Sequence, residues 1–279
     1  MSKSGGNQSV IIFRKYGFRI AEVWCDEPTE NITADIIRIH QAPFPARSVI
    51  STPVHTLVMD LRRSEQEIWG LIQKNTRYEI RRARKDGIRC EAWDGIEPSF
   101  LSRFRSAYDV LARQKKRLPM LPWDYVQRLV GAKTFDLSCA SNDLEGELVF
   151  HAHVLGLNSV RQWHSVSLFR DNTGAVSRMV GRANRLLHWE NMMRFKNIGY
   201  HTYDFGGWYD GKRDVEMLCI NAFKESFGGQ RAVCYSAEIF VSTRARIIAR
   251  NLIWISRIKS RFLNAKGKVV YRITNSLHY

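Results

Sequence analysis

The positions of hydrophobic residues divide the chain into a strand-rich first part and a second part in which strands and helices alternate. Runs in which apolar and polar residues alternate predict half-buried β-strands. The first two runs flank Lys15, Tyr16 and Gly17, which predicts a hairpin with a three-residue turn and a left-handed glycine. The strands predicted in this part cover residues 10–14, 18–24, 32–39 and 54–59.

A helix is predicted at residues 64–85, because apolar residues there recur every three or four positions. Ser64 and Glu67 have the Ser-x-x-Glu spacing of a capping box, and Gly87 ends the segment. The basic residues of its later turns share one face: Lys74, Arg77, Arg81, Arg84 and Lys85. This face is either solvated or bound to an anionic partner, and the density of arginine favours a partner because guanidinium binds phosphate and carboxylate bidentately.

The middle of the chain predicts two helices followed by three strands. The helices cover residues 98–116 and a short segment that begins at Pro122, a residue suited to the first helical position. The strands cover residues 134–140, 147–156 and 159–169, and the last two form a hairpin. Alternation along the second of these strands places His151 and His153 on the same face.

The later part centres on residues 199–229, which predict a strand, a turn of two glycines, a polar loop and a helix. Paired glycines after a strand are either a plain turn or a place where a ligand approaches the main chain. A long helix at 177–197 precedes this segment, and strand 231–241 follows it. The predicted core positions of helix 214–226 are Val215, Cys219, Ala222 and Phe223.

This order of elements predicts a mixed α/β fold. We expect three parts: a β-rich unit at residues 10–93, a second unit with a central mixed sheet flanked by helices at 94–242, and a basic tail at 243–279.

The tail differs in charge from the rest of the chain, whose overall net charge is +16. From residue 239 onward there is no Asp or Glu, and nine residues are basic: Arg244, Arg246, Arg250, Arg257, Lys259, Arg261, Lys266, Lys268 and Arg272. The spacing from Arg244 to Leu263 predicts a basic amphipathic helix, which either docks on the body or contacts anionic lipid or another polyanion.

The sequence lacks the motifs of several kinds of functional site. Five scattered cysteines without a CxxC pair argue against disulfides and structural zinc, and no apolar run is long enough to span a bilayer. We therefore expect a cytoplasmic protein, with any membrane contact peripheral at the inner face. The pair His151 and His153 lacks a third ligand, so we predict no metal site. What remains is acid–base chemistry around Tyr203, Asp204, Tyr209 and Asp210.

Two blocks of sequence resemble a known family. GRANRLLHWENMMRFKNIGYHTYDFGG, followed by INAFKESFGG, is similar to the C-terminal signature of FemAB-like proteins, the peptidoglycan bridge aminoacyltransferases and their relatives in the GNAT (Gcn5-related N-acetyltransferase) superfamily. TLVMDLRRSEQEIWGLIQKNTRYEIRRARKDGI resembles the family's N-terminal signature. The resemblance covers about residues 54–240 and implies a GNAT-like fold and acyl or aminoacyl transfer.

Carried over by position, the resemblance implies roles for particular residues. Phe223 and Lys224 face the reaction site, and Lys224 neutralises charge on the donor or the tetrahedral intermediate. Arg77 and Arg81 lie near an anionic substrate. The floor beneath the acceptor is formed by Asp204, Phe205, Gly206 and Gly207.

The donor implied by the resemblance is acyl-CoA rather than a tightly bound cofactor. Arg178, Gly181 and Ala183 fit the Arg-x-x-Gly-x-Ala pattern that resembles the pyrophosphate-binding turn of acyl-CoA-using members. Aminoacyl-tRNA is the second candidate, less favoured because the chain is short for two full acetyltransferase units and shows no coiled-coil arm.

The resulting hypothesis is an N-acyltransferase that acts on an amine of a sugar-nucleotide or lipid-linked envelope precursor. Asp204, His151 or His153 takes the amine proton, and Tyr203 or Tyr209 protonates the leaving group. Trp208 and Tyr209 complete the expected substrate contacts. The alternative from another class is a non-enzymatic protein that binds nucleic acid or an anionic membrane surface on the same fold.

Overall fold

The computed structural model describes residues 10–25, 32–42, 50–92, 97–115, 119–168, 174–249 and 251 of the 279. The strands are β1 (Ile11–Lys15), β2 (Phe18–Trp24), β3 (Ile36–Ala42), β4 (Ile50–Asp60), β5 (Arg89–Ala92), β6 (Phe135–Asn142), β7 (Gly146–Leu155), β8 (Ser159–Ser167), β9 (Thr202–Gly207) and β10 (Gln230–Phe240). The helices are α1 (Glu65–Leu71), α2 (Lys74–Lys85), α3 (Pro98–Gln114), α4 (Trp123–Gly131), α5 (Ala175–Asn197) and α6 (Val215–Glu225).

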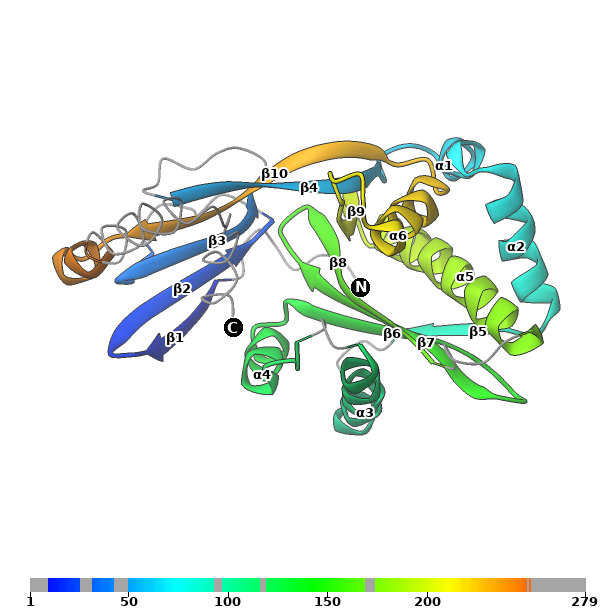
Figure 1. Cartoon of the computed structure of the whole chain (residues 1–279), viewed down its shortest axis with the longest axis horizontal. Coiled ribbons are helices and arrows are strands. Elements are labelled where there is room, and N and C mark those ends of the chain that lie inside the picture. Colours follow the sequence, from blue (N-terminus) through cyan, green and yellow to red (C-terminus); the bar gives the residue numbers. More distant parts are fainter. Residues whose placement is uncertain are drawn as a thin grey trace.

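These strands form one curled sheet in the order β1-β2-β3-β10-β4-β9-β8-β7-β6-β5 (Figure 1). The pairs β2–β3 and β8–β9 are parallel, and the other neighbours are antiparallel. The predicted mixed α/β class is confirmed. β10 lies between β3 and β4, so the sheet continues across the boundary predicted between residues 93 and 94.

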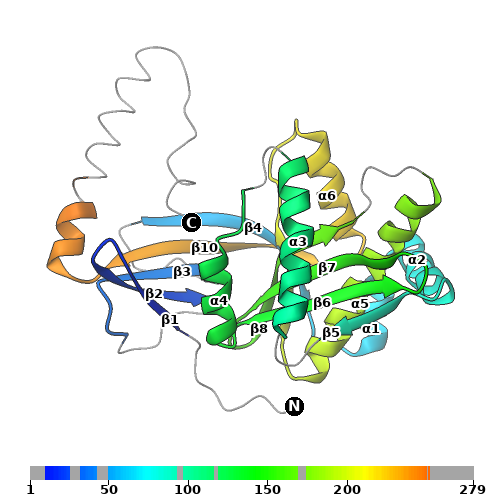
Figure 2. The same cartoon turned by 90° about the horizontal axis from the view of Figure 1, so that it is seen from below.

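Helices cover both faces of the half of the sheet that contains β5 to β9. α5 packs on one face, with α1, α2 and α6 beside it, whereas α3 and α4 cover the opposite face of β6, β7 and β8 (Figures 1 and 2). Each face has its own apolar core. Phe195, Tyr203 and Phe205 belong to the core under α5, and Phe104 and Phe150 belong to the one under α3 and α4.

The predicted first hairpin is present, but its turn has two residues instead of three. Lys15 pairs directly with Phe18, and both Tyr16 (φ 52°) and Gly17 (φ 76°) have positive φ. Two central residues with positive φ give the turn a twist that matches the strands. The sequence suggested the longer turn because a non-glycine residue rarely takes this conformation.

The helix predicted at residues 64–85 is two helices. The capping box at Ser64 and Glu67 is confirmed, and α1 begins after it. The chain then becomes extended at Ile72 (ψ 133°), whose side chain is buried. The amide of Gln73 donates to the carbonyl of Ser226 (2.9 Å), so a contact with the end of α6 replaces a helical hydrogen bond. A partner so distant in sequence leaves no local signal.

The other differences concern the ends of strands. The strand predicted at 32–39 lies at Ile36–Ala42, and the four-residue β5 was not predicted. β4 begins earlier than expected and includes Pro53. A proline fits there because β9 pairs with β4 only from Thr56 onward, so Pro53 needs no amide on that side. Pro122 precedes α4 as its N-cap instead of being its first residue.

The core positions predicted for α6 are wrong. Val215, Cys219 and Ala222 are exposed, and Phe223 is only partly buried. The buried residue of this helix is Asn221, whose side chain accepts from the amide of Tyr209 (3.1 Å) and donates to its carbonyl (2.7 Å). α6 is therefore attached through hydrogen bonds to the loop after β9, which hydrophobic periodicity does not reveal.

The first turns of the predicted C-terminal helix dock on the body. Residues 243–249 are helical, Ala245 and Ala249 are buried, and the Arg244 guanidinium lies 4.9 Å from the centre of the Phe18 ring. Ile248, expected on the buried side, is exposed. The rest of the predicted segment, to Leu263, lies outside the described residues. None of the helices in the described ranges is long and apolar enough to cross a membrane.

The junction between α6 and α1 gives a test of the fold. Gly228 has φ +78°, and a Cβ there would lie 2.3 Å from the carbonyl oxygen of Leu71. We predict that Gly228→Ala lowers the free energy of unfolding by about 3 kcal/mol, because backbone strain adds to this clash. Gly70→Ala in α1, where a Cβ meets nothing within 4 Å, is the control and should be neutral or slightly stabilising. Urea unfolding measures both, and equal midpoints for the two variants would contradict this close contact.

Candidate functional site

The central irregularity of the sheet is the fork between β8 and β9, defined here as residues 161–167 of β8 and 204–207 of β9. The two strands pair from Ser159 with Thr202 to Arg161 with Asp204, and then separate (Figure 1). Gly206 has φ +83°, and a Cβ there would lie 2.9 Å from the Gln162 carbonyl oxygen. This close approach requires glycine, which explains one of the two glycines singled out from the sequence.

A buried ion pair occupies the base of the fork. Arg161 Nη1 donates to Asp204 Oδ2 (2.7 Å), and both residues are less than a tenth exposed. Asp204 Oδ1 accepts from the Gly206 amide (2.7 Å) and from the Thr56 hydroxyl, and Arg161 also donates to the Gln41 side chain. These contacts tie β8 and β9 to β4 and β3. The Asp204 carboxylate is thus engaged by three donors, and its predicted role as proton acceptor stays a prediction.

Lys224 reaches the fork from α6. Its Nζ donates to the Gly207 carbonyl (2.6 Å), and the side chain is only partly exposed. Burial lowers the pKa of Lys224 to about 8, and the positive charge of Arg161 adds to this, while Asp204 opposes it. Lys224 therefore lies beside Gly206 and Gly207, and its predicted catalytic role stays a prediction. A cation held in a partly dry environment is a suitable group to stabilise a developing negative charge.

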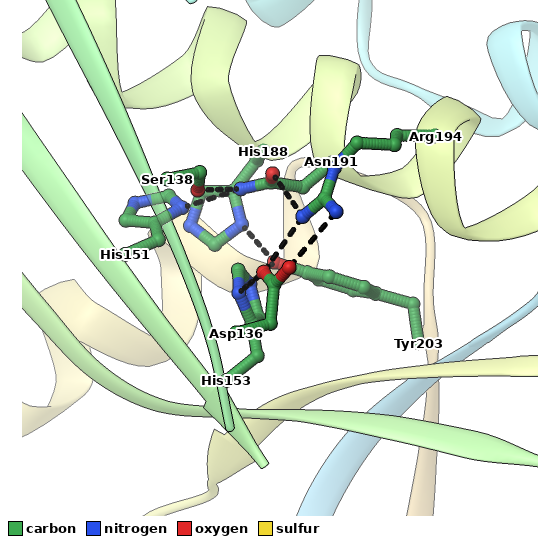
Figure 3. A network of polar contacts seen from close by, with 8 residues as sticks. All are labelled: Asp136, Ser138, His151, His153, His188, Asn191, Arg194 and Tyr203. Atoms are coloured by element: carbon green, nitrogen blue, oxygen red, sulfur yellow. Dashed lines mark hydrogen bonds and ion pairs between the residues drawn. The ribbon is translucent and has the colours of Figure 1, made fainter. Parts of the chain in front are cut away.

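A second polar cluster lies between the sheet and α5 (Figure 3). Arg194 donates to both carboxylate oxygens of Asp136 (2.8 and 2.6 Å), and Asp136 contacts His153 Nδ1 (3.2 Å). The Tyr203 hydroxyl lies between His153 Nε2 (3.2 Å) and His188 Nδ1 (3.1 Å). An ionised carboxylate only accepts, so His153 donates to Asp136, Tyr203 donates to His153, and His188 donates to Tyr203.

His151 belongs to the same cluster. Its Nε2 contacts Asn184 Oδ1 (2.8 Å), and its Nδ1 accepts from Asn191 Nδ2 (3.2 Å), which also donates to Ser138 (2.9 Å). His188, Asn191 and Arg194 recur every three residues and therefore project from one face of α5 toward the strands (Figure 3). The prediction that His151 and His153 share a face of β7 is confirmed by this common network.

Burial keeps these histidines neutral. It lowers the pKa of His151 to about 3, and it also lowers the pKa of His153 and, strongly, that of His188. Burial likewise raises the pKa of Tyr203, so its hydroxyl stays protonated. His151, His153 and Tyr203 have no exposed surface, so direct contact with a substrate requires a rearrangement of the core. In the described ranges, no three His, Cys, Asp or Glu side chains are placed to hold a metal ion.

The loop after β9 borders a small pocket. Its volume is about 120 Å³, and its lining comprises His55, Thr56, Trp208, Asp210, Arg231, Ala232 and Val233. The Arg231 guanidinium lies 4.5 Å from the centre of the Trp208 ring. Trp208 is therefore in contact with a hollow next to the fork. Tyr209 does not line this pocket, and Phe205 is buried against Tyr203 and Phe227.

The remaining predicted site residues lie on the helices around α6. Arg77 donates to the carbonyls of Trp69 (3.3 Å) and Gly70 (3.4 Å), so it caps the end of α1. Arg81 is exposed, with its guanidinium 6.0 Å from the centre of the Trp69 ring. Both arginines therefore stabilise the corner between α1 and α2, whatever substrate role they also have.

The Arg-x-x-Gly-x-Ala pattern lies along α5, whose first residue is Ala175. Arg178 is exposed in the first turn, whereas Gly181 and Ala183 follow in later turns, and Ala183 is fully buried. Amides in later turns of a helix bond to carbonyls four residues earlier, so they are not free to hold phosphate. In this pattern only Arg178 lies beside the unbonded amides of a helix start.

Sequence reasoning missed several residues of these clusters. Arg161 had a usable signal, since it is the one Lys, Arg, Asp or Glu of strand SVRQWHSVS, and a charge that becomes buried in a sheet needs a partner. His188 lies between Leu187 and Trp189 in a helix and carried no signal of its own. Asp136 and Arg194 are 58 positions apart, so only the packing of α5 on β6 brings them together.

Comparison with known proteins identifies the fold. No family model matches the chain, and no curated protein matches its sequence. The structure is similar to that of FemX, with a TM-score of 0.58, 12% identity, and coverage of 83% of this chain and 84% of FemX.

Two further solved structures match less closely. The C-terminal domain of an Agrobacterium fabrum protein assigned as a lysylphosphatidylglycerol synthetase has a TM-score of 0.49, 11% identity and 78% and 72% coverage. A tandem GNAT protein from the clavulanic acid pathway has a TM-score of 0.35, 14% identity and 82% coverage of each chain.

The chain therefore has the fold of FemX. This confirms the FemAB-like fold predicted from the two sequence blocks.

The neutral histidine cluster predicts acid instability. The unfolded chain takes up protons near pH 6.5, whereas His151 in the folded chain does so only near pH 3, so unfolding is favoured as the pH falls below 6.5. Each such histidine should cost about 1.4 kcal/mol of stability per pH unit in this window. Urea midpoints between pH 6.5 and 4.5 measure the slope, and His151→Gln should lower the slope by the contribution of one histidine. A wild-type midpoint that does not change over this range would refute the neutral cluster.

Proposed function

We propose that this chain, which has the FemX fold, is an N-acyltransferase whose reaction takes place at the fork between β8 and β9. The observation that carries the proposal is the position of Lys224, a partly buried cation held 2.6 Å from the Gly207 carbonyl where the strands separate. The sequence resemblance assigns the same residue to charge neutralisation. Position and resemblance thus support one role for one side chain.

The separated part of β8 offers a surface for the donor. Gln162 Nε2 and Ser165 Oγ are buried there and have no hydrogen-bond partner in the described part of the chain. Buried polar atoms without partners are uncommon and require an explanation. Beyond Arg161, the edge of β8 is also unpaired on the β9 side. An extended donor that carries amide groups would pair with this edge and supply the missing partners.

The reaction is a direct transfer in a ternary complex. The acceptor amine forms a bond to the acyl carbon, the bond from that carbon to the leaving thiolate or ribose oxygen breaks, and the amine loses a proton. Lys224 would stabilise the negative oxygen of the tetrahedral intermediate, and proximity supplies much of the rate. Asp204, His151 or His153 as proton acceptor, and Tyr203 or Tyr209 as proton donor, belong to the same proposal.

The donor and acceptor are proposed at the level of chemical class. Acyl-CoA is the preferred donor, with Arg178 in the first turn of α5 as a candidate phosphate contact, and aminoacyl-tRNA is the second choice. The acceptor is an amine on a sugar-nucleotide or lipid-linked envelope precursor. The net charge of +16 supports phosphate-bearing substrates in general, and the basic segment from Arg244 to Leu263 supports contact with an anionic membrane.

Lys224 gives the decisive test. A donor and an acceptor are first found by thermal-shift screening of acyl-CoAs, charged tRNA and amino-sugar nucleotides, and transfer is then followed by release of CoA or tRNA. We predict that Lys224→Ala lowers kcat by about 100-fold or more, as loss of a group that stabilises the oxyanion does. Lys212→Ala, which removes an exposed lysine of the nearby loop, is the control and should leave kcat within twofold.

The pH profile separates a charged role of Lys224 from a merely structural one. The cation is lost as the pH rises through its pKa of about 8, so wild-type kcat should fall above pH 8. Lys224→Arg keeps its charge and should retain activity to higher pH. Full activity in Lys224→Ala would refute the proposal. Salt-sensitive RNA or DNA binding of nanomolar affinity, with no ligand in the screen, would favour the polyanion-binding alternative.

A further inference from the structure

Arg185 on α5 carries a positive charge that few groups of the fold compensate. Its guanidinium lies 5.0 Å from the centre of the Phe223 ring, and Nη1 donates to the carbonyl of Gly181 in its own helix (3.0 Å). Its Nε is buried without a hydrogen-bond partner. Across the described ranges no carboxylate lies within ion-pair distance of Arg185, and Glu79 on α2 acts on it only from further away. The positive charge of Arg185 is thus not compensated by a carboxylate of the described residues.

Three other arginines near α5 have carboxylate partners. Arg182, three residues earlier on α5, contacts Asp86 (2.9 Å), and Arg84 contacts Glu190 (2.7 Å). Arg161 is paired with Asp204. Burying a charge is costly unless a partner of opposite charge compensates it, so a partly buried arginine that lacks such a partner is the exception.

Lys224 is a second cation on the same side of α5 as His188. Both charges act on His188, where they contribute to its lowered pKa, and Lys224 follows Phe223 directly in α6. Neither Lys224 nor Arg185 has a carboxylate within ion-pair distance in the described part of the chain. Arg185, Phe223 and Lys224 are each partly exposed. Two cations without a carboxylate partner thus act on the same buried histidine.

We propose that Arg185, Phe223 and Lys224 form a binding site for an oxyanion, either a phosphoryl group or a carboxylate of a substrate. The terminal nitrogens of the Arg185 guanidinium bind oxygens of the anion, and the Lys224 ammonium supplies a second positive charge from α6. Phe223 holds the guanidinium plane in place and supplies an apolar surface for the adjoining part of the ligand.

This oxyanion site is separate from the start of α5. Arg185 lies ten residues beyond Ala175, which corresponds to about 15 Å along a helix. The site depends on side chains of α5 and α6, whereas a phosphate at the helix start depends on free backbone amides. It also stands without the proposed acyl transfer, because anion binding is measured in the absence of any donor or acceptor.

Binding of simple anions tests the proposal on the full chain. Inorganic phosphate, pyrophosphate, acetate and glutarate are titrated at constant ionic strength, and the shift of Tm and the heat of binding give Kd. In wild type we expect stabilisation by the phosphates, the carboxylates or both. Arg185→Gln should weaken that binding by about tenfold, and Arg185→Lys by less, since lysine keeps the charge but lacks the planar fork. Arg182→Gln removes the same charge from a paired arginine of the same helix and should leave Kd within twofold.

Each outcome has a defined meaning. Phosphate-only binding that depends on Arg185 assigns the site to a phosphoryl group, and carboxylate-only binding assigns it to a carboxylate; either result supports the site. Binding that Arg185→Gln and Arg182→Gln weaken equally reflects general charge and overturns it. An unchanged Kd in both Arg185 variants also overturns it, and so does a wild type that binds none of the four anions.

Circular dichroism checks that each variant is folded, and Arg185→Lys keeps the test valid if Arg185→Gln does not fold. If anion binding behaves as expected while Lys224→Ala retains full transfer activity, the oxyanion site stands and the proposed function fails.

Discussion

The buried ion pair between Arg161 and Asp204 is the interaction on which the rest of the site depends. It joins β8 and β9 at the last residues that pair, and the Thr56 and Gln41 side chains extend it to β4 and β3. An ion pair with so little exposure is stable only because additional hydrogen bonds satisfy both charges. It therefore fixes where the parallel pairing ends, and consequently where the fork begins.

The histidine cluster has a complementary structural role. The charged groups of the cluster are Arg194 and Asp136, which pair at its edge. The histidines farther in are neutral, and the donor assigned to each of their hydrogen bonds agrees with the donors of the neighbouring bonds. A connected polar network of this kind favours one arrangement of α5 on the sheet. The position of α5 in turn determines where Arg185 stands relative to α6.

Uncompensated charge distinguishes Lys224 and Arg185 from the paired cations of the interior. Arg161 and Arg194 have carboxylate partners, whereas Lys224 rests on a carbonyl and Arg185 on an aromatic ring. A fold that pays desolvation for two cations without pairing them is arranged for an anion that arrives with the substrate. The same pattern fits the proposed transfer reaction, in which negative charge develops on the acyl oxygen.

The sequence by itself determined what depends on local spacing. It gave the mixed α/β class, most of the helices and strands, the capping box at Ser64, and the placement of His151 and His153 on one face, because periodicity and turn residues act over a few positions. It also singled out Gly206 and Lys224, through a resemblance that the FemX fold supports. Only the tertiary structure decided the break at Ile72, the exposed face of α6 and the partners of Asp204 and Arg185. Each of these depends on a contact between residues far apart in the chain, and the balance of charge at such a contact is set by packing, for which local sequence holds no signal.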